Sequence, residues 1–278
     1  MALSDFTIIV PSLINVSIAH IDHLASCLDI QAIVCIPRLI QGPLQFSPHI
    51  SFVRSSKAGQ VFQRLHAISC AKTRYVIVMD DDIFFPISDC FSVIHKYIKL
   101  ASSIVPSVLG VHITCQSLVT SSPNILSCRA LSLLSFIEGT SQTLLTSPST
   151  LSPLLFNTPH DPSFVDCYSR DFGCYRSDWI SGGFFLAPVS LFPVTNYYPY
   201  PGKAFSEDII LSSLFTARGA SLFIANGVYA TTDIINPSFS FSNLRSKIYL
   251  LRFSNVSLRF PRFILSLLVR RLSLMSWF

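Results

Sequence analysis

The stretch YVIVMDDD, residues 75–82, joins an uninterrupted apolar segment directly to three carboxylates. Its β-branched residues favour a strand, and the absence of polar alternation predicts burial on both faces of a sheet. In parallel sheets covered by helices, ligands bind outside the carboxyl ends of the strands. The position of Asp80, Asp81 and Asp82 therefore predicts a ligand site at the end of this strand.

The acidic triplet itself points to a metal-bound substrate. Adjacent carboxylates repel one another, so a purely structural role gives them little reason to cluster. Hard divalent cations bind oxygen ligands, and Mg²⁺ is often held by one or two carboxylates together with substrate phosphates. We interpret the triplet as a site for a metal and a nucleotide; the alternative is a solvated acidic turn.

Strands and helices alternate around this segment. The pattern predicts an α/β sandwich with a mostly parallel central sheet. Besides residues 75–79, strands are expected at 6–10, 30–36, 50–53 and 110–114, and helices at 16–28, 60–71 and 88–102. The last helix is expected to be capped by Ser88 and to bury a face made of Phe91, Ile94, Ile98 and Ala101.

A second acidic pair, Glu207 and Asp208, follows Ser206 at the start of an expected helix. Ser206 is a suitable N-cap, Gly219 is a suitable C-terminal stop, and a strand is expected at 221–225. Acidic residues are common in the first turn of any helix, because they interact favourably with its dipole. Taken alone, the pair therefore has an ordinary structural explanation.

Residues 139–165 are rich in Ser, Thr and Pro, and this composition predicts a surface loop.

The charge of the chain is unevenly distributed. The 278 residues are 50% hydrophobic and only 13% charged, with a formal net charge of +5. Residues 244–278 hold seven basic residues and no acidic one, so residues 1–243 carry a net charge of −2. A body without a basic surface argues against nucleic acid as a partner.

The N-terminus and the cysteines predict a cytoplasmic protein. MALSDFTIIVPS has no basic residue and places Asp5 before its short apolar run, unlike a secretory signal. The uncharged stretch at 100–128 is broken by Pro106, Gly110 and Pro123, so we do not expect it to span a membrane. Eight scattered cysteines without CxxC spacing are expected to be reduced thiols rather than zinc ligands.

Four segments together resemble the inverting glycosyltransferases of family 2, which have a Rossmann-like GT-A fold. FTIIVP at 6–11 is similar to the first strand of that family, and KAGQVFQRLHAISCAKTRYVIVMDDD at 57–82 to its helix, strand and DxD motif. DWISGGFFL at 178–186 resembles the segment on the acceptor side. PGKAFSEDIILSSLFTARGASLFIA at 201–225 resembles the ED helix and the following strand. The resemblance spans roughly residues 5–235.

The resemblance implies a role for each acidic residue. Asp80 would face the ribose or base of a nucleotide sugar, with Asp81 also on the donor side. Asp82, with Asp80 as a second ligand, would hold the Mn²⁺ or Mg²⁺ that bridges the diphosphate. Asp208 or Glu207 would be the catalytic base.

The resemblance also implies roles for four other residues. Gly182 and Gly183 would let the backbone approach the donor or acceptor sugar, and Lys57 and Arg64 would contact phosphate or brace the donor site. Two departures from the family stand out. The stretch AIVCIPRLIQG after the second strand contains no acid, and no histidine follows His160.

The resemblance implies transfer of a sugar from a nucleotide-sugar donor to a saccharide or lipid-linked acceptor, in surface polysaccharide synthesis. Two alternatives remain open at this point. A haloacid-dehalogenase-like phosphatase also places DxD after an apolar strand, but it needs a small residue where Phe84 stands. A catalytically inactive, membrane-associated glycosyltransferase-like scaffold would keep the fold and lose the chemistry.

The basic tail predicts a second unit of the chain. We expect a glycosyltransferase domain at 1–243 and a helical, basic, amphipathic extension at 244–278. A helix from Pro261 onward would place apolar residues beside Arg270 and Arg271 and end at Trp277 and Phe278. Such a helix is typical of docking on an anionic membrane surface. We therefore expect residues 255–278 either to dock on the inner face of the cytoplasmic membrane or to pack on the body.

Overall fold

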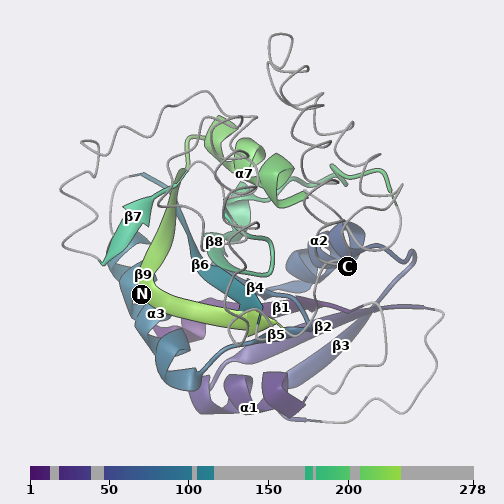
Figure 1. Cartoon of the computed structure of the whole chain (residues 1–278). Coiled ribbons are helices and arrows are strands. Elements are labelled where there is room, and N and C mark those ends of the chain that lie inside the picture. Colours follow the sequence, from purple (N-terminus) through teal and green to yellow (C-terminus); the bar gives the residue numbers. More distant parts are fainter. Residues whose placement is uncertain are drawn as a thin grey trace, which may run out of the picture.

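The computed structural model describes residues 1–12, 19–38, 47–101, 105–115, 173–177, 180–200 and 207–232. These residues form a nine-stranded sheet with helices on both faces (Figure 1). The strands are β1 (Phe6–Pro11), β2 (Gln31–Pro37), β3 (Ile50–Ser55), β4 (Tyr75–Met79), β5 (Ile83–Phe84), β6 (Ser107–Cys115), β7 (Cys174–Arg176), β8 (Phe184–Pro188) and β9 (Ser221–Thr232). The helices are α1 (Ala19–Leu28), α2 (Gln60–Cys70), α3 (Ile87–Ala101) and α7 (Glu207–Ala217), with short 3₁₀ turns at Leu3–Asp5 and Val189–Leu191.

The strand order is β3-β2-β1-β4-β8-β6-β9-β5, and β7 pairs with β9. Strands β1 to β4 are parallel, as the alternation of strands and helices predicts, and β6 and β9 run in the same direction. Strand β8 is inserted antiparallel between β4 and β6. Most strands thus point one way, but the sheet is mixed, and β8 brings the start of a distant segment to the carboxyl end of β4.

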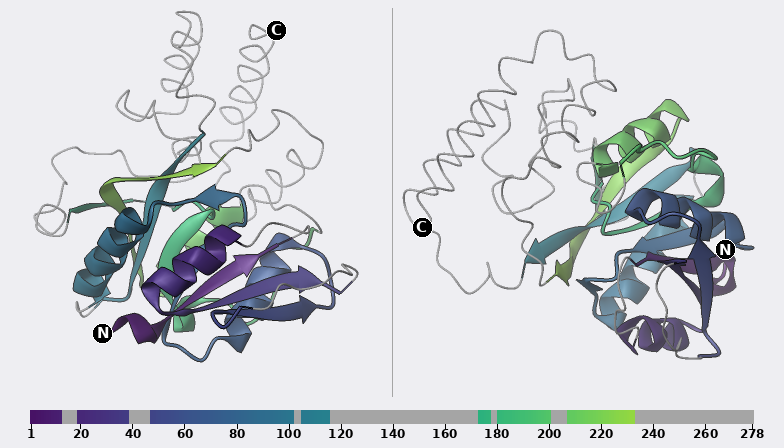
Figure 2. Two further views of the ribbon diagram at one scale, coloured as in Figure 1. Left: turned by 90° about the horizontal axis from the view of Figure 1, so that it is seen from below. Right: turned by 90° about the vertical axis from the view of Figure 1, so that its right-hand side faces the viewer.

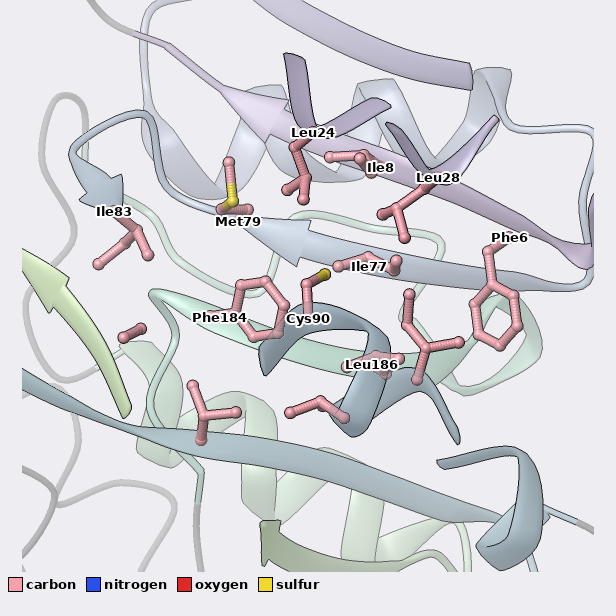
Figure 3. Close-up of a cluster of buried hydrophobic side chains, with 14 of the residues drawn as sticks. Phe6, Ile8, Leu24, Leu28, Ile77, Met79, Ile83, Cys90, Phe184 and Leu186 are labelled. Atoms are coloured by element: carbon pink, nitrogen blue, oxygen red, sulfur yellow. The ribbon is translucent and has the colours of Figure 1, made fainter. Parts of the chain in front are cut away.

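Helices lie on both sides of the sheet (Figure 2), and an apolar layer fills the space on each side. Successive residues of β1 point to opposite faces, so Ile8 packs with α1 and α3, while Ile9 packs with α2 and α7. Figure 3 shows the first layer, in which Leu24 of α1 and Cys90 of α3 lie over Ile77 of the central strand β4. This two-sided burial explains why the strand sequences show no polar alternation.

Helix α3 differs from its prediction at both its start and its face. It begins at Ile87, and the Cys90 N–H donates to the Pro86 carbonyl, so Ser88 lies inside the first turn rather than at the cap. The buried face carries Cys90, Val93, Ile94, Tyr97 and Leu100, whereas Phe91 is 40% exposed. Of the expected face, Ile94 is buried, and Ile98 and Ala101 are partly buried and pack against the core. Phe91 was wrong, and the fully buried stripe is centred about one residue away from the expected one.

The end of α7 confirms its prediction. Gly219 has a φ of +79°, and its N–H donates to the Thr216 carbonyl. The Ala220 N–H donates to the Phe215 carbonyl, which completes a Schellman cap. The strand that follows is longer than expected, because β9 continues through Gly227, which has a φ of +71°, to Thr232.

Several predicted segments lie outside the described residues: the cap at Ser206, the loop at 139–165, and the extension at 244–278. The boundary between residues 243 and 244 stays a prediction. Among the described helices, none is long and apolar enough to cross a membrane.

Four of the described cysteines form a buried pair and an exposed pair. Cys35 and Cys90 are buried, and burial raises the pKa of their thiols to about 11 and about 12. Cys27 and Cys70 are exposed. The thiolate is the reactive form, so burial and raised pKa both protect the first pair.

We expect iodoacetamide near neutral pH to modify Cys27 and Cys70 in the folded protein and to leave Cys35 and Cys90 unmodified. Peptide mass spectrometry measures the modification at each position. Unfolding in denaturant before labelling is the control and should make all four cysteines react. Modification of Cys35 or Cys90 at the rate of Cys70 in the folded protein would contradict the burial described above.

Candidate active site

The acidic triplet forms a turn at the carboxyl end of β4. The Asp80 N–H donates to the Gly183 carbonyl at 2.9 Å, which anchors the turn to the residue before β8. The Ile83 N–H donates to the Asp80 carbonyl at 3.2 Å, so Asp81 and Asp82 occupy the two central positions of the turn. All three carboxyl-bearing residues are partly exposed. The turn therefore presents carboxylates at the edge where the sequence predicts a ligand.

Arg64 of α2 connects this turn to the start of α7. Its side chain is only 1% exposed, and its Nη1 contacts Glu207 Oε1 at 2.5 Å. Its Nη2 lies 3.3 Å from Asp80 Oδ1 and donates to the Gly182 carbonyl, also at 3.3 Å. A buried guanidinium needs such partners, because an unpaired buried charge is strongly unfavourable. One side chain thus joins α2, β4, the segment before β8, and α7.

The buried charges perturb one another. Burial lowers the pKa of Arg64, but the carboxylates of Glu207 and Asp80 outweigh it and hold the guanidinium firmly protonated with a raised pKa. Burial raises the pKa of Asp80 to about 6; the charge of Arg64 opposes this shift, and repulsion from Asp82 adds to it. Arg64 pairs with Asp80 and Glu207, and Asp82 adds a further carboxylate to the turn.

The two acidic residues at the start of α7 have different surroundings. Glu207 is 4% exposed, and both carboxylate oxygens are engaged, Oε1 by Arg64 and Oε2 by the Tyr197 hydroxyl at 2.7 Å. Asp208 is partly exposed, and its carbonyl accepts a hydrogen bond from the Ser212 hydroxyl at 2.7 Å. Of the pair, Asp208 is the more exposed residue.

The two glycines before β8 are both buried against protein side chains. A Cβ atom at Gly182 would lie 2.8 Å from Glu207 Oε1, and a Cβ atom at Gly183 would lie 2.5 Å from Ile113 Cδ1. At these distances the neighbouring side chain would have to move, and Glu207 Oε1 is held in place by Arg64. Glycine at both positions therefore allows α7 and β6 to approach the acidic turn closely.

Lys57 is the predicted site residue that the structure does not bring into this cluster. It lies after β3 and is exposed, and its carbonyl accepts a hydrogen bond from the Ser55 hydroxyl. Within the described part of the chain, no ion pair joins it to the acidic residues. Its expected role toward phosphate stays a prediction.

Three site residues were missed by sequence reasoning. Gln60 donates to Asp80 Oδ2 at 2.9 Å, Tyr197 binds Glu207, and the Thr232 hydroxyl lies 3.5 Å from Asp82 Oδ2. Gln60 precedes Arg64 by one helical turn, so both lie on the same face of α2. The predicted role of Arg64 could therefore have indicated that Gln60 also belongs to the site. Thr232 was missed because the expected strand stopped at Ala225. Tyr197 lies in a Tyr- and Pro-rich segment without any local signal.

The residues of the turn fit a divalent cation that takes part of its ligands from a substrate. Among the described residues, no group of three or more acids, histidines or cysteines is arranged to hold a metal alone. Asp80 and Asp82 are close enough to repel each other, and a cation between them would relieve that repulsion. Mg²⁺ and related ions are commonly held by one or two carboxylates plus phosphate oxygens.

The comparison with solved structures identifies the architecture. GalNAc-T7, solved with UDP, GalNAc and Mn²⁺, aligns with a TM-score of 0.55 at 9% identity over 89% of this chain. Glucosyl-3-phosphoglycerate synthase from Mycobacterium tuberculosis, solved with Mn²⁺, UDP and phosphoglyceric acid, aligns with a TM-score of 0.51 at 13% identity over 89% of this chain. The chain has a GT-A fold.

A third GT-A structure extends the likeness. S. aureus TarS 1–349 in complex with UDP-GlcNAc aligns with a TM-score of 0.51 at 12% identity, again over 89% of this chain. The matches cover 48% of the GalNAc-T7 chain, 78% of the synthase and 65% of TarS, so this chain spans about half the length of the first. Neither a protein-family model nor a curated protein matches the chain by sequence.

Proposed function

We propose that the chain is a metal-dependent inverting glycosyltransferase that moves a sugar from a nucleotide-sugar donor to a saccharide or lipid-linked acceptor. The observation that carries the proposal is the buried bridge through Arg64, which holds the Asp80–Asp82 turn and the start of α7 together. The bridge supports the proposal because it brings the acidic turn close to the helix start that carries Asp208, a partly exposed residue.

The solved structures support the choice of donor and metal. All three compared proteins were solved with UDP or a UDP-sugar, and two of them with Mn²⁺. On this basis we propose a nucleotide sugar as donor and Mn²⁺ or Mg²⁺ as cofactor for this chain. Asp82 would be the principal protein ligand, because Asp80 already binds Gln60 and Arg64 through its two oxygens.

The residues at this edge divide the chemistry between them. We assign Asp208 as the general base that takes the proton from the acceptor hydroxyl, because both oxygens of Glu207 are already engaged. A bound divalent cation would supply Lewis-acid stabilisation of the charge on the leaving diphosphate. Attack by the deprotonated hydroxyl on the sugar carbon, from the face opposite the leaving group, inverts the anomeric centre.

Four other residues are assigned to the donor side of the site, as the sequence predicts. Asp81 occupies a central position of the turn and is assigned to the donor nucleotide. The carbonyls of Gly182 and Gly183 bind Arg64 and Asp80, so we propose that these glycines shape the donor edge by close packing. Lys57 is assigned a contact with phosphate.

The setting of the reaction rests on the basic tail. We propose that residues 255–278 dock the enzyme on the inner face of the cytoplasmic membrane, where lipid-linked acceptors for surface polysaccharides are assembled. The seven basic residues at 244–278 support attraction to anionic lipid.

The inactive-scaffold alternative shares the fold and differs in catalysis, so measured sugar transfer separates it from the proposed function. The phosphatase alternative receives no support from the likeness to GT-A structures. Ligand binding tests the proposed site and identifies the donor for the transfer assay, so it is the first experiment.

A panel of nucleoside diphosphates and nucleotide sugars, with and without Mn²⁺, provides this test by thermal shift. We expect at least one nucleotide to raise Tm only when Mn²⁺ is present, because a ligand that binds the folded state stabilises it by mass action. At a concentration about 100 times Kd, the stabilisation is about 2.7 kcal/mol.

Two matched variants locate the binding. Asp82→Asn should abolish the Mn²⁺-dependent shift. Asp29→Asn removes an exposed carboxylate after α1, at a φ of 53° that Asn also tolerates, and should retain the shift. A panel without any Mn²⁺-dependent shift, or an equal shift in Asp82→Asn, contradicts the proposed site.

A further inference from the structure

Tyr197 is a polar side chain at the site that the proposed chemistry does not use. Its hydroxyl donates to Glu207 Oε2 at 2.7 Å, and its ring packs against the apolar layer that α2 and α7 share. Burial, followed by the charge of Glu207, raises the pKa of Tyr197 well above the usual tyrosine value. The hydroxyl therefore stays protonated and remains a hydrogen-bond donor.

The bond to Tyr197 ends a continuous chain of contacts across the site. Gln60 binds Asp80, Asp80 binds Arg64, Arg64 binds Glu207, and Glu207 binds Tyr197. The chain passes from α2 and the acidic turn to the first residue of α7 and then to the segment after β8. Its centre, the Arg64–Glu207 pair, is buried, so water competes little for that contact, while Gln60, Asp80 and Tyr197 are partly exposed.

Glu207 is held at two points by this arrangement. Arg64 fixes one carboxylate oxygen from the side of the acidic turn, and Tyr197 fixes the other. A single partner would leave the carboxylate able to rotate about the Cγ–Cδ bond. Two partners on different oxygens prevent that rotation. Because Asp208 follows Glu207 in the same helical turn, holding Glu207 also fixes the backbone that carries Asp208.

We propose that Tyr197 is a positioning residue, which acts through Glu207 to hold the first turn of α7 so that Asp208 faces the acidic turn. The proposal rests on the proposed function, in which Asp208 removes the acceptor proton. The two adjacent acids then have different roles: Asp208 takes the proton, and Glu207, held by Tyr197, keeps the helix backbone in place. A misplacement of about 1 Å costs roughly 100-fold in rate for a positioned catalytic group.

Tyr197→Phe tests the proposal, because it removes the hydroxyl and keeps the ring in the apolar layer. Tyr97→Phe is the matched control: Tyr97 is a buried tyrosine whose hydroxyl donates to the Ser107 carbonyl at 3.2 Å, outside the cluster. We expect Tyr197→Phe to lower kcat by about tenfold to 100-fold, with the donor KM and the Mn²⁺–UDP thermal shift within about twofold of wild type. Tyr97→Phe should leave kcat near wild type.

Hydrogen exchange gives a second readout that needs no activity. The amides of residues 211–214 bond to the carbonyls of the first turn of α7, so loosening that turn exposes them to exchange. Tyr197→Phe should speed their exchange, and Tyr97→Phe should not. If wild type transfers no sugar, the proposed function fails, and the exchange result alone decides whether Tyr197 holds α7.

Three outcomes overturn the proposal. The first is a kcat equal to that of Tyr97→Phe. The second is a fall in kcat matched by an equal loss of donor affinity, which would place Tyr197 in donor binding. The third is unchanged exchange at residues 211–214.

Discussion

Replacement of Asp208 by Asn is expected to reduce sugar transfer by about 10²–10⁴-fold, the usual contribution of a general base. The amide is close in shape to the carboxylate but cannot take the acceptor proton. Asp208 is partly exposed at the start of α7, so the exchange should disturb neither the core nor the Arg64 bridge. Steady-state transfer from the nucleotide sugar found by the thermal-shift panel measures the effect.

Donor binding, measured by thermal shift, is the control for this prediction. Asp208→Asn should keep the Mn²⁺-dependent thermal shift of wild type, because the acidic turn is unchanged. Loss of transfer together with a retained shift identifies a defect in chemistry rather than in binding. If Asp208→Asn retained more than about a tenth of the wild-type rate, Asp208 would be excluded as the base. A loss of less than about tenfold is smaller than the contribution of a general base.

Replacement of Arg64 by Met is expected to destabilise the protein by about 3–5 kcal/mol, the cost of breaking a buried ion pair by removing one partner. Methionine fills a similar volume but leaves Glu207 and Asp80 without their cation, and Glu207 is 4% exposed. Unfolding in urea, followed by circular dichroism, measures the free energy of unfolding. The slope of the transition should stay constant, because the surface exposed on unfolding is unchanged.

Two further variants test the cause of this loss. Arg218→Met removes an exposed arginine that donates to the Leu191 carbonyl, and should cost much less. Adding Glu207→Gln to Arg64→Met removes one of the two stranded charges and should recover part of the lost stability. If Arg64→Met were no less stable than Arg218→Met, the bridge would contribute nothing to the fold.

The strands and the position of the acidic turn could be predicted because burial on both faces leaves a local signature. The segments 6–10 and 75–79 are apolar apart from the buried Thr7, and the chain places Asp80–Asp82 at the end of the second. The direction of β8 has no such signature. FFLAP is a buried strand in either orientation, and only its pairing with β4 and β6 makes it antiparallel.

The roles of the individual site residues depend on tertiary contacts, which the spacing of residues in the sequence does not predict. Glu207 and Asp208 are equivalent as a sequence pair, and the structure separates them because Glu207 is buried and bonded to Arg64 and Tyr197, whereas Asp208 is partly exposed. Tyr197 could not be recognised because its partner is chosen by the path of the chain between β8 and α7. The face of α3 was misjudged for a different reason: Phe91 is as apolar as its buried neighbours but points outward.

The insertion of β8 between β4 and β6 has a consequence for biosynthesis. The edge of β4 pairs with a strand that lies over a hundred residues later in the chain. During translation, β1 to β4 emerge first and expose an unpaired apolar edge until residues 184–188 leave the ribosome. Unpaired strand edges promote aggregation, and pairing between distant segments slows folding. The nascent chain should therefore depend on chaperones at this stage, and truncation before residue 184 should yield insoluble protein.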